Sequence, residues 1–239
     1  INDLCEGLKS NPRLFADDVS LFSAVSDINV TANQMNSDLT LINEWAFKWK
    51  MQFNPDPSKQ AQEVLFSRKI KNVCHPNLNF NNNVVNQVSS QKHLGLILDQ
   101  KLDFNEHLKV VSSKVSRGIG LLRKLHHVLP RFSLLTIYKS FIRPHLDYGD
   151  VVFDQAFNES FHKRIESLQY SAALAITGAI RGSSREKIYQ ELGIESLRTR
   201  RWFRKLALFY KINRTKHPPY LYDLIPKREC IYETRQINN

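Results

Sequence analysis

The sequence has few of the features that mark membrane or secreted proteins. It contains no run of ~18 consecutive apolar residues, the length needed to cross a bilayer. Its first ten residues, INDLCEGLKS, lack the basic flank and apolar stretch of a signal peptide. Glycine and proline are sparse, and no period of about 20 to 50 residues recurs, which argues against a solenoid or propeller. We therefore expect an intracellular protein that does not associate with membranes.

Cysteine is also scarce. Cys5, Cys74 and Cys230 are scattered along the chain, and no pair or cluster has the spacing of a zinc site. An odd number of isolated cysteines fits reduced thiols in the cell interior. We expect neither disulfides nor a structural metal.

Acidic residues are few outside the first quarter of the chain. The net charge is +11, yet the segment up to Ser58 has 4 Lys and Arg against 8 Asp and Glu, whereas the remainder has 30 against 15. A basic body with a small acidic head favours a polyanionic partner, most plausibly nucleic acid, and a locally negative pocket for cations. The alternatives are a solvated basic surface, or a structural protein without a polyanionic partner.

The hydrophobic share of 42% is enough for a core, and its pattern predicts an α+β fold. Residues 1–100 form the first predicted domain, in the order strand, strand, helix, strand and hairpin. The apolar residues of the expected helix recur at steps of three and four. The predicted elements are a hairpin over Leu14 to Phe22 with its tight turn at Asp17-Asp18, a helix over Met35, Leu39, Ile42, Ala46 and Trp49, a strand at Val64 to Phe66, a turn at Asn79 to Val85, and one strand over Lys92 to Asp99.

Residues 101–239 change character and predict a helical bundle. Apolar residues at helical spacing, together with Ser, Gly and Pro at the ends, mark five helices. These are Leu108 to Leu125, a helix capped by Ser133 and ended by Pro144, Phe161 to Ile176 closed by Gly178, a short helix after Ser183-Ser184-Arg185-Glu186, and a last helix anchored by Trp202, Leu206 and Phe209.

The stretch RLFADDVSLFS, from Arg13 to Ser23, carries two adjacent carboxylates inside an apolar run. Successive residues of a strand point to opposite faces, so Asp17 and Asp18 can converge only at a turn. Two close carboxylates repel one another unless a divalent cation or a basic partner lies between them, and oxygen ligands suit magnesium. An ordinary solvated turn is the simpler explanation of Asp-Asp alone. The apolar flanks instead favour a hairpin held within a core.

These residues carry a family resemblance. The stretch around Phe15-Ala16-Asp17-Asp18 resembles the metal-binding motif of reverse transcriptases, and the rest of the chain resembles non-LTR retrotransposons of the jockey type. The similarity extends in order through INEWAFKWKMQFNPDPSKQAQEVLFSRK (Ile42 to Lys69), KHLGLILDQKLDFNEHL (Lys92 to Leu108) and LLTIYKSFIRPHLDYGDVVF (Leu134 to Phe153). These stretches are similar to the later part of the polymerase palm, the primer-contacting hairpin and the helical region beyond it.

The resemblance implies roles for individual residues. Asp17 would ligate the catalytic Mg²⁺ ions, with Mn²⁺ as the alternative, Asp18 would assist, and Phe15 and Ala16 would border the nucleotide. Lys59 would donate a proton to pyrophosphate; its alternative is a solvated lysine. His93 and Gly95 would lie near the primer terminus, or simply mark a strand with close backbone approach at glycine.

The resemblance also implies a fragment. The family's third metal-binding aspartate lies upstream of the Asp-Asp hairpin, and this chain begins sixteen residues before Asp17. We expect half a palm followed by an α-helical thumb and extension, inactive as a polymerase alone. The implied partners are an RNA template, a DNA primer and deoxynucleoside triphosphates, within a ribonucleoprotein of nucleus and cytoplasm. The alternative is a non-catalytic relic or domesticated fragment that only binds nucleic acid.

Two predicted helices are strongly basic. Their polar faces are expected to follow the phosphates of the template-primer duplex without reading sequence, although each could equally be a solvated face. Trp202, Phe203 and Phe209 fall at helical spacing and are expected in the core rather than as base-stacking platforms. Arg123 also belongs to the polar face of the first of these helices. The cations proposed to bind nucleic acid are Lys109, Lys114, Arg117, Lys124, Arg200, Arg201 and Arg204.

Overall fold

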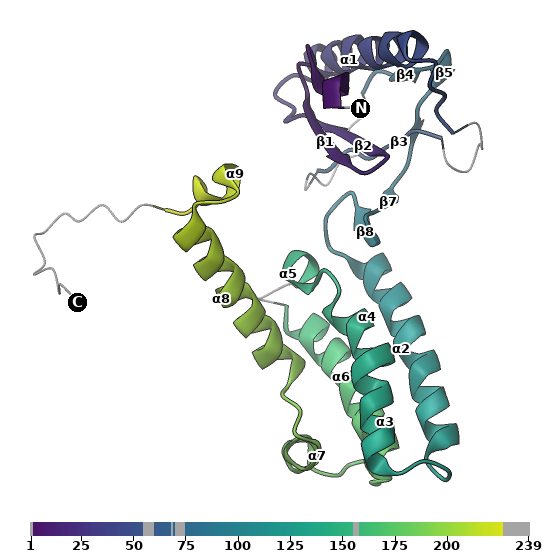
Figure 1. Cartoon of the computed structure of the whole chain (residues 1–239), viewed down its shortest axis with the longest axis vertical. Helices are drawn as coiled ribbons and strands as arrows, with labels where there is room; N and C mark the ends of the chain where they lie inside the picture. The colour runs from purple at the N-terminus through teal and green to yellow at the C-terminus, as the bar shows by residue number, and fades with distance from the viewer. Residues whose placement is uncertain (1, 55–59, 68, 70–74, 155–157, 227–239) are drawn as a thin grey trace, which may run out of the picture. The chain divides into compact units, whose positions relative to one another are not determined.

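The computed structural model describes residues 2–54, 60–67, 69, 75–154 and 158–226 (Figure 1). The chain divides into two compact units, Ile1–His107 and Leu108–Asn239. The first contains strands and helices and the described part of the second is helical, which confirms the α+β class. No helix within the described ranges is long and apolar enough to span a bilayer.

The first unit is built from short strands around one long helix, which begins earlier than the apolar pattern indicated. The described residues of this unit form four two-stranded sheets: β1 with β2, β4 with β5 and β7 with β8 pair antiparallel, whereas β3 with β6 pairs parallel. The elements are η1 (Asn2–Cys5), β1 (Asn11–Phe15), β2 (Asp18–Phe22), α1 (Ile28–Lys48), β3 (Gln62–Glu63), β4 (Asn79–Phe80), β5 (Asn83–Val84), β6 (Asn86–Gln87), β7 (Ser90–His93) and β8 (Leu96–Asp99).

Helix α1 organises this unit through its caps and side chains. The Asp27 carboxylate accepts hydrogen bonds from two N–H groups of the first turn, and Ala32, Ile42 and Ala46 form its buried face. Asn36 fixes the approach of β4, because its Oδ1 accepts from the Asn79 N–H at 2.8 Å. The short strand β4 is therefore held by a hydrogen bond to α1 as well as by its pairing with β5.

Two strand predictions in this unit were wrong. Val64 to Phe66 is not a strand; the pairing instead uses the two preceding residues, which lie parallel to β6. The range Lys92 to Asp99 is a hairpin rather than one strand, since Leu94 and Gly95 take φ angles of 44° and 84° and reverse the chain. The predicted turn over Asn79 to Val85 is confirmed as the β4-β5 hairpin.

The second unit is a helical bundle, as predicted. Helix α6 packs against α3, α7 and α8. The helices are α2 (Asn105–Leu125), which begins at the end of the first unit, α3 (Arg131–Ile137), the π-helical turn η3 (Tyr138–Ile142), α4 (Arg143–Asp147), α5 (Asp150–Phe153), α6 (Glu159–Thr177), α7 (Arg185–Leu192), α8 (Leu197–Thr215) and α9 (Pro219–Tyr222).

The helix predicted to end at Pro144 instead continues through it. It begins after Pro130, not at Ser133, and passes into α4 through the wide turn η3. Proline lacks the N–H that would close an ordinary helical turn, and a π turn accommodates the unpaired carbonyl. The predicted end of α6 is confirmed, since Gly178 is a left-handed C-cap with φ 72°.

A buried carboxylate fixes the start of α8. Glu166 of α6 accepts a hydrogen bond from the N–H of Leu197 at 3.0 Å and another from the Tyr189 hydroxyl at 2.7 Å. Burial, reinforced by the nearby carboxylate, raises the pKa of that tyrosine. The predicted capping box of α7 shifts by one residue, because Ser184 is the cap.

Candidate functional site

The Asp-Asp motif lies at the tip of the β1-β2 hairpin. Phe15 pairs with Asp18, so the two turn residues are Ala16 and Asp17, one position earlier than predicted. Ala16 takes a φ of 54°, the left-handed conformation that this tight reversal requires. The turn therefore presents Asp17 from the loop and Asp18 from the first position of β2.

The hairpin is exposed rather than held within a core. Phe15 is 63% exposed and Phe22 is 48% exposed, and both aspartates are exposed as well. The Arg13 guanidinium lies 5.1 Å from the ring centre of Phe22 and covers part of it. The prediction of a buried hairpin was wrong, because β1 and β2 form a sheet of two strands that no third strand joins among the described residues.

The hairpin is anchored to α1 by a buried carboxylate. Asp38 accepts hydrogen bonds from the N–H groups of Lys9 at 3.0 Å and Ser10 at 2.7 Å, immediately before β1. Burial alone would raise the pKa of Asp38, but these N–H donors outweigh it and the pKa is lowered. This contact holds the start of β1 against α1 and therefore fixes the position of the hairpin relative to that helix.

The tip carries two adjacent carboxylates, Asp17 and Asp18. Within the described ranges, no hydrogen bond or ion pair engages the side chain of Asp17 or Asp18, so all four carboxylate oxygens are available. Magnesium takes six oxygen ligands and commonly binds one or two carboxylates together with waters and substrate phosphates. The described residues contain no group of three or more His, Cys, Asp or Glu placed to hold a metal. The aspartate pair fits such an ion as part of a ligand set.

The other predicted residues of the first unit are spread over separate elements. Lys59 lies outside the described residues. His93 ends β7, and Gly95 is at the exposed tip of the β7-β8 hairpin. This hairpin is tied to the start of α2, because the N–H of Ile97 donates to Nδ1 of His107 at 3.3 Å.

Helix α2 separates its apolar and basic faces. One side of the helix is buried, and the cations predicted to bind nucleic acid are all exposed. The buried residues are Leu108, Val111, Val115, Ile119 and Leu122, and the exposed cations are Lys109, Lys114, Arg117 and Lys124.

The three arginines of α8 that were predicted to bind nucleic acid instead pair with acidic residues of the protein. Arg200 binds Asp147 through Nε at 3.1 Å and Nη2 at 2.9 Å, and this bond raises the pKa of the guanidinium. Arg204 lies 3.2 Å from Asp150, whose pKa is raised by burial. Both arginines therefore hold α8 to the preceding helices, a role that the prediction of phosphate contacts missed.

Arg201 is only 2% exposed, so the prediction that it binds nucleic acid was wrong. Its Nη1 reaches Asp154 at 3.2 Å, and its Nη2 donates to the Leu146 carbonyl at 2.9 Å. Burial lowers the pKa of this guanidinium. The acidic residues at intervals of three and four, Asp147, Asp150 and Asp154, were the sequence signal for this network.

The aromatic residues of α8 are on its outer face, so the expectation that they belong to the core was wrong. Trp202, Phe203 and Phe209 are 58%, 53% and 51% exposed. Helical spacing places them near one another but does not say which face has a partner. The buried face of α8 is formed by Leu197, Arg201 and Ile212.

Comparison with known proteins confirms the resemblance to the reverse transcriptases of jockey-type elements. The chain is 28% identical over 173 residues to a probable RNA-directed DNA polymerase from transposon X-element of Drosophila melanogaster, covering 71% of this chain and 18% of that protein. It is 26% identical over 192 residues to a probable RNA-directed DNA polymerase from transposon BS of the same species, covering 77% and 20%.

The RNA-directed DNA polymerase from mobile element jockey of Drosophila melanogaster is 25% identical over 170 residues, covering 69% of this chain and 18% of that protein. The chain thus spans about a fifth of the length of the curated relatives it matches. No family model matches it, and no solved structure matches it.

Proposed function

We propose that the chain is the part of a non-LTR element's RNA-directed DNA polymerase that carries the carboxylate hairpin of the polymerase centre and a helical unit for the template-primer duplex. The observation that carries this proposal is the exposed Asp17-Asp18 tip in a chain similar to three such polymerases. In this assignment the first unit is a part of the palm, and the second is the thumb and its extension.

The hairpin residues have distinct roles in the proposed reaction. Asp17 and Asp18 would hold Mg²⁺ or Mn²⁺, which supplies Lewis-acid stabilisation for nucleotidyl transfer when bound. Ala16, having only a methyl group, leaves the tip open to a deoxynucleoside triphosphate beside Phe15. Lys59 would donate a proton to the departing pyrophosphate.

The exposed cations of α2 provide the proposed surface for the RNA template and DNA primer. Lys109 and Lys124 are separated by a rise of about 22 Å along the helix, and Lys114 and Arg117 lie between them. Such a row matches successive backbone phosphates and reads no base sequence. His93 and Gly95, on the hairpin that precedes α2, would face the primer terminus.

Binding of an RNA-DNA hybrid tests this proposal. Fluorescence anisotropy of a labelled hybrid, measured over a salt series, should give a steep loss of affinity with salt. Neutralising all four α2 cations to Gln should flatten the slope of log K against log[salt] by about 3 to 4, since each phosphate contact contributes about 0.9.

A charge-matched variant serves as the control. Lys163→Gln, Arg164→Gln, Lys187→Gln and Arg214→Gln removes the same charge from other exposed positions of the second unit and should leave most of the slope. Equal losses in the two variants, or no binding by the unaltered chain, would overturn the proposed surface.

A non-catalytic nucleic-acid-binding relic is the second candidate function. It is favoured by the α2 surface, because this row of cations needs neither carboxylate of the hairpin. The two candidates share the binding of nucleic acid and differ in whether the hairpin binds a divalent cation.

A further inference from the structure

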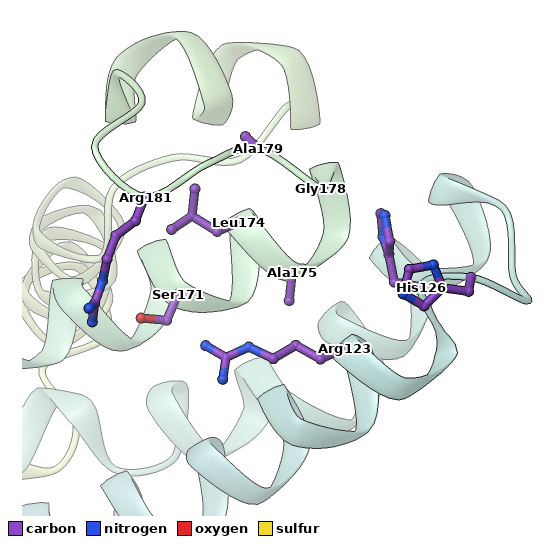
Figure 2. A pocket seen from close by; sticks show the side chains of 9 residues that line it. Arg123, His126, Ser171, Leu174, Ala175, Gly178, Ala179 and Arg181 are labelled. Atoms are coloured by element: carbon purple, nitrogen blue, oxygen red, sulfur yellow. The ribbon is translucent and has the colours of Figure 1, made fainter.

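A cleft of about 540 Å³ opens between the C-terminal end of α2, the C-terminal half of α6 and the loop that follows α6 (Figure 2). Its volume is within the range of small-molecule sites. All of its lining residues belong to the second unit. They are Arg123, His126, His127, Ser171, Leu174, Ala175, Gly178, Ala179 and Arg181.

The cleft is electropositive. Figure 2 shows the guanidinium groups of Arg123, from α2, and Arg181, from the loop, both extending toward Ser171. Among the described residues, no carboxylate pairs with either arginine, and none of the nine lining residues is acidic. The hydroxyl of Ser171 donates to the Ser167 carbonyl at 2.8 Å, so the two arginines are the main donors available to a ligand.

The histidine side of the cleft is closely packed. A Cβ added at Gly178 would lie 2.8 Å from Nε2 of His126, so the left-handed glycine gives the imidazole its space. The His126 and His127 rings meet edge to face, with centres 5.4 Å apart. Nδ1 of His126 is buried and has no hydrogen-bond partner within the described residues. The two imidazoles therefore add ring nitrogens to a cleft that is already lined by the guanidinium groups of Arg123 and Arg181.

We propose that this cleft binds a phosphate of a nucleic-acid backbone. Guanidinium forks match the geometry of phosphate oxygens, and two of them on facing elements can contact one phosphodiester together. Arg123 and Lys124 are both exposed cations in the last turn of α2, so the cleft lies at the end of the helix that carries the basic row. This inference deepens the proposed function and rests on it, because it names where the duplex is clamped beyond that row.

The test uses the full chain with a labelled RNA-DNA hybrid and, separately, inorganic phosphate. Arg123→Gln with Arg181→Gln should weaken hybrid binding about fivefold to tenfold at low salt and reduce the salt slope by about 1, because the cleft is proposed to hold one phosphate. The matched control, Lys163→Gln with Arg164→Gln, removes two exposed cations from outside the cleft and should have little effect. Unchanged thermal unfolding of both variants establishes that they are folded.

The outcomes separate this inference from the proposed function. If the unaltered chain binds the hybrid and the cleft variant binds it equally well, the cleft is not a nucleic-acid contact, although the proposed function stands. If the chain binds no hybrid at all, the proposed function fails as well. If inorganic phosphate shifts the NMR signals of the Arg123 and Arg181 side chains while the variant retains its hybrid affinity, the cleft takes free phosphate and the nucleic-acid occupant is wrong.

Discussion

Arg201→Met is expected to destabilise the second unit strongly. The substitution keeps an apolar stem but removes a buried guanidinium that binds Asp154 and the Leu146 carbonyl. It also removes a cation 5.1 Å from the ring centre of Phe153. Breaking a buried, hydrogen-bonded ion pair typically costs about 3 to 5 kcal/mol. We expect about 3 kcal/mol, because Asp154 retains Lys205 at 2.6 Å.

Arg198→Met provides a control in the same helix. Arg198 pairs with Glu159 at 2.9 Å, but both side chains are about 60% exposed, and pairs of this kind contribute about 1 kcal/mol or less. Urea unfolding followed by far-ultraviolet circular dichroism measures both variants. Equal losses of unfolding free energy would refute the conclusion that the buried arginine holds α8 in place.

Three further predictions concern packing and pH. Gly118→Ala should lower the free energy of unfolding by about 1 kcal/mol, because its Cβ would lie 2.7 Å from Cγ1 of Ile142. Gly120→Ala meets open space and should raise the free energy of unfolding by a similar amount. If urea unfolding shows that both variants shift this free energy in the same direction, the close packing of α2 at Gly118 is contradicted. Gly178→Ala should lower the stability of the second unit more than Gly193→Ala does, since both glycines are left-handed caps but only Gly178 faces His126. Thermal unfolding of the two variants measures this difference, and equal losses would contradict the contact with His126. Asp38→Asn should destabilise the first unit by about 2 kcal/mol at neutral pH. The pKa of Asp38 is lowered on folding from 3.8, so this stabilisation is complete above about pH 4 and is lost progressively as the pH falls through the lower pKa of the folded protein. A difference between the two proteins that does not shrink as the pH is lowered from about 4 would contradict its ionic origin.

Local chemistry made much of the fold predictable from the sequence. Gly178 ends α6 because a left-handed cap follows a long apolar periodicity. Asn81 and Asn82 turn the β4-β5 hairpin with φ angles of 50° and 61°, which asparagine tolerates well. Each of these features depends only on a few neighbouring residues.

Features that depend on distant partners were not predictable in the same way. The spacing of Trp202, Phe203 and Phe209 shows that they are neighbours, but the buried face of α8 is selected by acidic residues some fifty positions earlier. The passage through Pro144 depends on a π turn that periodicity does not encode. The single strand predicted over Lys92 to Asp99 was wrong, whereas the resemblance to a primer-contacting hairpin indicated the observed reversal.

The same distinction between local and distant interactions applies to the candidate site. The sequence identified Asp17 and Asp18 and placed them at a hairpin tip, although the turn is one residue earlier. It also identified the exposed cations of α2 from their position opposite the apolar stripe. The cleft was missed, because Arg123 and Arg181 are 58 positions apart in sequence and line one cavity only in the folded second unit.

Binding of Mn²⁺ at the hairpin tests the central claim most directly. In NMR spectra of the full chain, paramagnetic Mn²⁺ should broaden the amide signals of Ala16, Asp17 and Asp18 at concentrations that leave Asp223, another exposed aspartate, unaffected. Two carboxylates predict an affinity of about 1 mM or weaker, and Asp17→Asn with Asp18→Asn should abolish the selective broadening. Equal broadening at the hairpin and at Asp223 would contradict a divalent-cation site at the tip.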